Sequence, residues 1–281
     1  MYSYIPFFFL IFILGGCVNL KKVNDFSSNS TKSIKNFEDL EYSFTKACIE
    51  KCELEQLENN QIQKTKCECK SEKEADKISS LIYKAIKGYF EGMTNLSENK
   101  LTTYKFNALT KALKEGDFGD IQLNKKHIDS YAKISGILTR AITDSYRKRK
   151  ISTYIGDAND AIKILLEALE FNMVSNLSKK LDVKKQRLES YYFDLSVDTT
   201  ITGFEKKKII EEYNTLTDEI DTRKDQIALY GKGLNNIAAG HQKLYDNRNK
   251  LNAGEIKEQL SQYSSDIQDI VDEFNKLKKE K

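Results

Sequence analysis

The stretch Thr202-Gly203-Phe204-Glu205-Lys206-Lys207-Lys208-Ile209-Ile210 begins the longest helix that the sequence predicts, from about Phe204 to Leu251. Thr202 and Glu205 have the spacing of a capping box, in which the hydroxyl and the carboxylate each accept a hydrogen bond from a backbone N–H that the first turn leaves unpaired. Apolar side chains then recur every three or four residues and share one face. A helix this long needs long partners to cover that face.

Two further segments supply such partners. Residues 157–195 and 256–277 both carry apolar side chains at helical spacing. The single proline of the 281-residue chain is Pro6, and because proline costs about 3 kcal/mol in a helix interior, its absence elsewhere favours long helices. The sequence therefore predicts an all-α fold, an elongated antiparallel helical bundle with coiled-coil-like hairpins over residues 71–281.

The N-terminus predicts where the protein is located. Residues 5–14 carry no charged or polar side chain, and this run is too short to span a hydrocarbon core of about 30 Å, as is typical of a signal peptide. It ends in Leu14-Gly15-Gly16-Cys17, which resembles the lipobox of bacterial lipoproteins. The resemblance implies that residues 1–16 are removed and that a lipid with fatty acyl chains such as palmitate is attached to Cys17.

A lipid on Cys17 would anchor the protein to a membrane of the bacterial cell envelope. Val18 follows, and in a Gram-negative source the absence of aspartate at this position implies the outer membrane. Residues 1–4 lack lysine and arginine, so an ordinary secretory signal and a retained membrane anchor are the alternatives. Residues 17–36 are rich in Ser, Asn and Lys, which predicts a lipid-anchored flexible tether.

Four cysteines remain after Cys17, an even number that favours disulfides in an oxidising compartment. Cys48 and Cys52 lie one helical turn apart, and a chain reversal would bring Cys67 and Cys69 back against them. We therefore predict a disulfide-pinned helical hairpin over residues 37–70, with the nested pairs Cys52–Cys67 and Cys48–Cys69; the parallel pairing is the second choice. The rival interpretation, a four-thiolate zinc site, fits the tight Cys-x-Cys spacing poorly.

The charge pattern argues against nucleic acid as a partner. The chain has 45 Lys+Arg and 42 Asp+Glu, mixed along its length, whereas nucleic-acid affinity comes from clustered cations. The single dense basic run, residues 147–150, has two interpretations. It can complement the negative end of a helix dipole, or it can contact acidic lipid headgroups if it faces a membrane.

No catalytic constellation stands out. The two histidines, His127 and His241, lie far apart in sequence and outside any metal-binding spacing; His241 falls on an apolar helix face, which favours a hydrogen-bonded core histidine. The glycines between residues 231 and 240 lack the frame of a phosphate-binding loop. A kink or the close approach of a crossing helix explains them better. No cofactor and no metal are predicted.

Tyr191-Tyr192-Phe193 is the strongest candidate for a partner-binding cluster, because its aromatic side chains cover more than one helix face. The first functional hypothesis is accordingly a non-catalytic, membrane-anchored structural or protein-interaction module. The alternative is a carrier of a hydrophobic small ligand between the helices of the bundle, which a pocket of several hundred cubic ångströms would favour. An enzyme is the third and weakest hypothesis.

Overall fold

The computed structural model of the chain describes residues 20–61, 65–98, 100, 121, 123–143, 147–251 and 253–279. The predicted signal peptide and the predicted lipid attachment site at Cys17 lie outside the described residues. In chain order the elements are α1 (Lys21–Lys35), the 3-10 turn η1 (Asn36–Asp39), α2 (Phe44–Glu58), α3 (Lys70–Ser97), α4 (Lys125–Thr143), α5 (Arg147–Leu169), the π-helical segment η2 (Glu170–Asn176), α6 (Leu177–Val197), α7 (Gly203–Asp246) and α8 (Gly254–Lys279).

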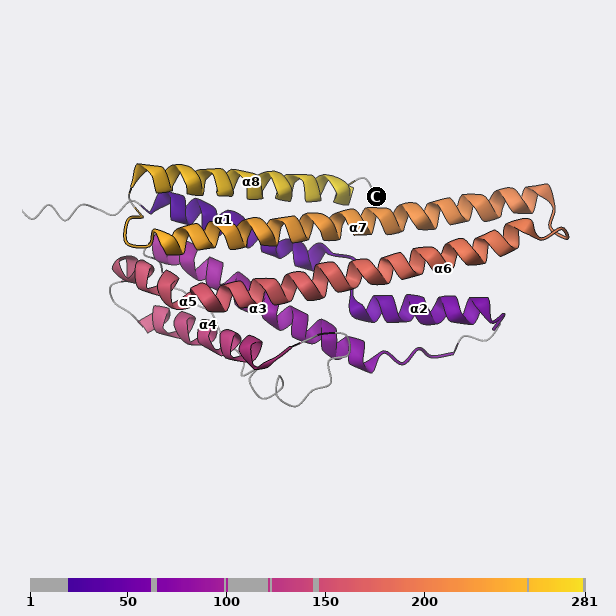
Figure 1. Cartoon of the computed structure of the whole chain (residues 1–281), viewed down its shortest axis with the longest axis horizontal. Coiled ribbons are helices and arrows are strands. Elements are labelled where there is room, and N and C mark those ends of the chain that lie inside the picture. The colour runs from indigo at the N-terminus through magenta and orange to yellow at the C-terminus, as the bar shows by residue number, and fades with distance from the viewer. Residues whose placement is uncertain are drawn as a thin grey trace, which may run out of the picture.

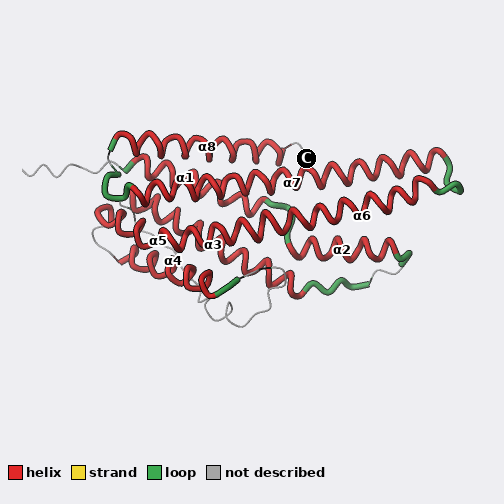
Figure 2. Tube along the Cα trace, in the orientation of Figure 1, coloured by secondary structure: helices red, strands yellow, loops and turns green. Residues whose placement is uncertain are grey.

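The predicted all-α bundle is confirmed, since the described residues form helices and no strand. α6 and α7 pair as an antiparallel hairpin, and α8 folds back along the C-terminal part of α7 (Figure 1). Figure 2 shows α6 and α7 continuing past the end of α8 to a short turn. At 1.5 Å per residue the 44 residues of α7 measure about 66 Å, which accounts for the elongated shape.

Local signals in the sequence account for the start of α7. The backbone N–H of Glu205 donates to Oγ1 of Thr202 at 3.3 Å, and the backbone N–H of Thr202 donates to Oε2 of Glu205 at 2.8 Å. The predicted capping box is thus confirmed. The predicted helix over residues 157–195 is present as parts of α5 and α6, joined through the wider π-helical turns of η2.

The predicted tether over residues 17–36 is wrong where the structure describes it. Residues 21–35 form α1, which lies inside the bundle against α3, α7 and α8. Phe26 and Ile34 are fully buried, and three serines share the buried face: Ser27, Ser30 and Ser33. Serine counts as polar in a composition argument, but its small side chain lets two helix backbones approach closely. Residues 21–35 are therefore part of the bundle.

The glycines of α7 lie where α1 crosses it. A β-carbon on Gly240 would stand 2.3 Å from Cε2 of Phe26, and one on Gly233 would stand 2.3 Å from Oγ of Ser33. Real β-carbons essentially never approach other atoms this closely, so a side chain at position 240 would require the buried Phe26 ring to move, and one at position 233 would require the Ser33 hydroxyl to rotate away. The close approach of a crossing helix, predicted from the glycine cluster, is confirmed.

Candidate functional site

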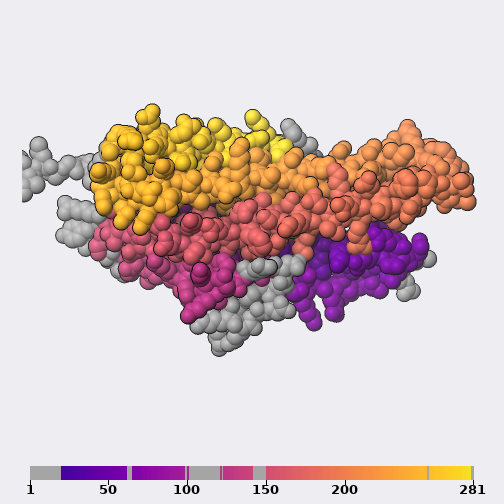
Figure 3. All heavy atoms as spheres, viewed as in Figure 1, coloured from indigo at the N-terminus to yellow at the C-terminus, as the bar shows by residue number. Residues whose placement is uncertain are grey.

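The turn between α6 and α7 exposes a concentrated group of apolar side chains. Of the eight large apolar residues that the described chain exposes, four lie here, and we call them the tip patch: Phe193 (63% exposed), Val197 (55%), Phe204 (66%) and Ile210 (51%). Figure 3 shows no other described segment over the tip on the face in view. An exposed apolar group of this kind, surrounded by charged residues, is typical of a protein-binding surface.

The predicted aromatic cluster Tyr191-Tyr192-Phe193 lies at this tip, but its three side chains have different environments. Phe193 is exposed, Tyr191 is half-buried, and Tyr192 is 7% exposed with its ring 5.8 Å from that of Tyr213. Tyr192 thus packs α6 against α7 and offers little surface to a partner, which corrects its predicted role. Sequence reasoning missed Val197, Phe204 and Ile210, because their exposure depends on how far the hairpin extends beyond its neighbours.

A shallow hollow of about 250 Å³ lies beside the tip patch. It has Phe193 and Ser196 from α6 on one side and Ile209 and Ile210 from α7 on the other. Lys208 lies over the Phe204 ring at 4.7 Å, a cation–π contact that leaves the ring edge open to solvent. The patch therefore combines aromatic anchors with a small depression between two helices, as partner-binding surfaces commonly do.

The cysteines form the predicted nested disulfides, Cys48–Cys69 and Cys52–Cys67, each with its α-carbons 6.0 Å apart. A sulfur in a disulfide is not the thiolate that a zinc site requires, so the disulfide interpretation replaces the zinc one. The bonds join α2 to the non-helical segment 65–69, which leads into α3. We call residues 43–69 the α2 hairpin.

The predicted helical hairpin over residues 37–70 begins later than expected. Residues 36–39 form the 3-10 turn η1, and α2 begins only at Phe44. Asp76 of α3 explains this boundary, because its carboxylate accepts hydrogen bonds from the backbone N–H groups of Phe44 (2.8 Å) and Thr45 (3.0 Å). Ser43 adds a third bond from the N–H of Lys46. This helix start therefore depends on a residue more than thirty positions away.

Ion pairs hold α2 against α6 and α7. Glu50 accepts from Nζ of Lys184 at 2.8 Å and from Nη1 of Arg223 at 3.1 Å, and the three side chains are 12–18% exposed. Arg187 of α6 pairs with Glu55 and Glu58 of α2. Charge-assisted bonds between poorly exposed side chains fix the distance between α2 and α6.

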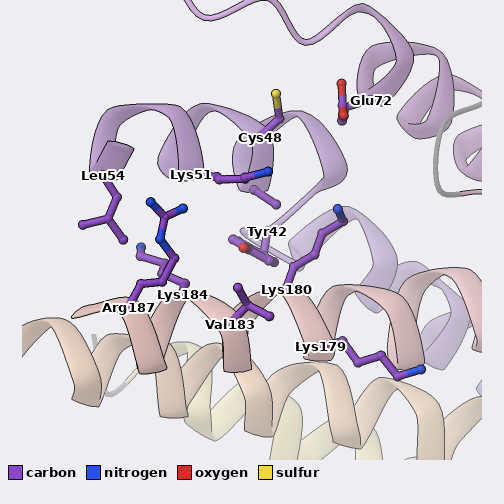
Figure 4. A pocket seen from close by; sticks show the side chains of 11 residues that line it. Tyr42, Cys48, Lys51, Leu54, Glu72, Lys179, Lys180, Val183, Lys184 and Arg187 are labelled. Carbon is purple, nitrogen blue, oxygen red and sulfur yellow. The ribbon is translucent and has the colours of Figure 1, made fainter. Parts of the chain in front are cut away.

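A groove with a volume of about 430 Å³ runs between α2 and α6, which form its two walls. Figure 4 shows side chains from both helices converging on it, with the buried Tyr42 between the two helices. We call it the α2–α6 groove. It lies between α2 of the disulfide-bonded hairpin and α6, whereas the carrier hypothesis placed a pocket between the helices of the bundle over residues 71–281.

The predicted core role of His241 is confirmed. The side chain is 2% exposed, and its Nε2 lies 2.8 Å from the hydroxyl of Tyr89. Burial lowers the pKa of His241 to about 4, so the imidazole is neutral at pH 7. His127 has a local role at the start of α4, where its Nδ1 accepts from the backbone N–H of Asn124 at 2.9 Å. Among the described residues, the hydrogen-bond partner of His241 is the buried Tyr89 hydroxyl and that of His127 is the Asn124 backbone.

We expect this histidine to make the protein less stable in mild acid. The pKa is depressed in the folded state from about 6.5 to about 4, so the unfolded chain binds more protons between these values and stability falls as the pH drops through that window. The expected loss between pH 7 and pH 5 is about 2 kcal/mol in the free energy of unfolding, measured by urea denaturation.

A His241→Gln variant should remove most of this pH dependence, because glutamine does not titrate and can still bond to Tyr89. The His127→Gln variant is the control. Burial also lowers the pKa of His127, with Glu167 opposing the shift, so this variant should keep the larger part of the loss. If the free energy of unfolding of His241→Gln fell between pH 7 and pH 5 as much as that of the native chain, another group would be responsible for the pH dependence.

No helix in the described part of the chain is both long enough and apolar enough to cross a membrane. Comparison of the chain with models of protein families, with curated proteins and with solved structures finds no match.

Proposed function

We propose that the protein is a lipid-anchored protein of the bacterial cell envelope that binds another protein through the tip patch and catalyses no reaction. The observation that carries the proposal is the position of the patch. It lies at the end of the α6–α7 hairpin, whereas α1 begins at the opposite end of the bundle (Figure 1). An anchor close to α1 and an apolar surface at the far end suit a protein that presents a binding site away from a membrane.

The length of chain before α1 supports this arrangement. Cys17 precedes Leu20, the first described residue, by three positions. Three residues reach at most about 11 Å, so a lipid on Cys17 would hold the start of α1 close to the membrane surface. α7 alone is about 66 Å long, and the tip patch would then be the part of the bundle farthest from the anchor.

The chemistry of the tip patch favours a protein as the ligand. Phe193 and Phe204 are each more than 60% exposed, and aromatic side chains dominate the binding energy of protein interfaces. Val197 and Ile210 extend the apolar surface around them. The charged residues nearby, including Asp194 and Lys208, would form the polar rim.

The test is site-specific crosslinking in membranes of the source cells. A photoreactive residue in place of Asp194, which is exposed beside the patch, should give a distinct crosslinked product that mass spectrometry identifies. The double variant Phe193→Ser/Phe204→Ser should reduce the yield of that product at least tenfold, because about 1.4 kcal/mol of lost contact corresponds to a tenfold change.

The matched control is Phe171→Ser, which removes an exposed phenylalanine (39% exposed) from η2. It should leave the yield unchanged. An intact mass of the native protein should match a chain that begins at Cys17 with acyl groups, whereas a Cys17→Ser variant should carry no acyl groups and should retain residues 1–16. Equal yields from the tip variant and the control would contradict the tip as the binding site; a native chain without acyl groups would contradict the anchor.

A further inference from the structure

We propose that the α2–α6 groove binds a single-chain amphiphile with an anionic headgroup, such as a long-chain carboxylate or alkyl phosphate. This inference is independent of the tip patch and of its protein partner. It differs from the carrier hypothesis in the place of the site and in the charge of the ligand. The argument has three parts: an apolar floor, a basic rim, and two walls that are fixed before a ligand arrives.

The floor of the groove is apolar. Tyr42, Ala47 and Leu54 are each less than 8% exposed and line it from the side of α2, together with the Cys48–Cys69 disulfide. Val183 of α6 lines the opposite side and is 52% exposed. A volume of about 430 Å³ is within the range of small-molecule sites. An alkyl chain in the groove would cover Val183.

The rim of the groove is positively charged. Five of its lining residues are cations and one is an acid; the cations are Lys51, Lys179, Lys180, Lys184 and Arg187, and the acid is Glu72. Lys184 and Arg187 are already paired with carboxylates of α2. Figure 4 shows the side chains of Lys51 and Lys180 extending over the opening from its two sides. Lys180 lies over the Phe44 ring at 6.0 Å and Lys51 contacts Glu55, and these two ammonium groups at the opening are the candidates for the headgroup contact.

Lys51 is well placed to serve such a headgroup. Its side chain is 68% exposed, and its contact with Glu55 is long, at 3.9 Å between Nζ and Oε1. An ion pair of this length and exposure contributes little to the stability of the protein, so an anion could replace Glu55 as the partner of Lys51 at a small cost in free energy. Burial raises the pKa of Tyr42, whose hydroxyl stays protonated at neutral pH and can donate a hydrogen bond inside the groove.

Both walls are fixed in the absence of a ligand. The two disulfides and the Asp76 carboxylate hold α2, and the bonds of Glu50 to Lys184 and Arg223 hold α6 at a set distance from it. A preformed site avoids the cost of ordering its walls on binding. An acidic protein segment is the competing occupant, but the limited volume of the groove favours one small molecule.

The test is photolabelling of the full-length protein in isolated membranes with a photoreactive dodecanoate. The label should map to peptides from α2 and α6. Excess dodecanoate or dodecyl phosphate should displace it, and the more effective of the two identifies the headgroup. Dodecanol and dodecyltrimethylammonium should displace it at least tenfold less well, because they lack the anion that the lysines would bind.

The variant Lys51→Glu/Lys180→Glu should raise the half-displacing concentration of dodecanoate at least tenfold. The control is Lys133→Glu/Lys163→Glu, which makes the same change in charge at exposed positions of α4 and α5. It should leave the half-displacing concentration unchanged. Val183→Asp should weaken labelling through the apolar floor. Equal displacement by dodecanol, labels outside the groove, or equal behaviour of the two double variants would overturn the proposal. The tip variant should label normally, which separates this test from that of the proposed function.

Discussion

Replacement of Gly240 by leucine is expected to lower the free energy of unfolding by about 3 kcal/mol, near the upper end of the usual cost of overpacking a core. The reason is the crossing of α1 and α7. Even a β-carbon at this position would stand 2.3 Å from Cε2 of Phe26 and 2.7 Å from its Cζ. Phe26 is completely buried, so its ring has no free space into which to move. Urea denaturation followed by circular dichroism measures the change.

The control is a glycine in a helix with open space around it. Gly136 lies on the exposed side of α4, and a β-carbon there would have no neighbour within 4 Å. Gly136→Ala should therefore stabilise the protein by about 1 kcal/mol, the difference in helix propensity between the two residues. If the Gly240 variant were as stable as the native chain, α1 would not lie against α7, and the polar segment before α2 would be a tether after all.

Short-range signals carried the correct predictions of the fold. The start of α7 was predictable because Thr202 and Glu205 lie three residues apart and act on each other's backbone. α1 was not predictable in the same way. Three of its seven buried residues are serines, and whether a serine is buried depends on the residue opposite it, as Gly233 of α7 is for Ser33. The glycine cluster was visible in the sequence, but the helix that it accommodates was not.

The candidate sites show the same contrast between features set by neighbouring residues, which were predictable, and features set by packing, which were not. The disulfide pairing followed from the spacing of four cysteines on one helix and one returning segment. The tip patch was found in part, because an aromatic cluster shows in the sequence while its exposure does not. The α2–α6 groove was not foreseen, since it combines residues near position 50 with residues near position 180. Only the packing of α2 on α6 brings those cations together.

Removal of both disulfides, through serine at Cys48, Cys52, Cys67 and Cys69, is expected to cost about 4 kcal/mol in the stability of the α2 hairpin. Closing a loop of about 15 residues contributes roughly 3 kcal/mol in the chain-entropy model, and the outer bond of the nested pair adds to it. The loss should be concentrated in α2, because α7 and α8 do not depend on these bonds. Hydrogen exchange should therefore show lost protection in α2 amides and retained protection in α7 amides.

The matched control keeps the disulfides and removes the central ion pair of α2. Glu50→Gln abolishes the charge that Lys184 and Arg223 share; Arg223 keeps its longer contact with Glu219 at 3.7 Å, whereas the poorly exposed Lys184 loses its carboxylate. We expect a clear but smaller loss of α2 protection than in the four-serine chain, because the covalent loops still restrict the unfolded hairpin. Uniform loss of protection along the chain without disulfides would instead mean that α2 and the bundle unfold as one cooperative unit. Unchanged protection of α2 would show that Asp76 and the ion pairs alone keep the hairpin, and with it the α2–α6 groove, in place.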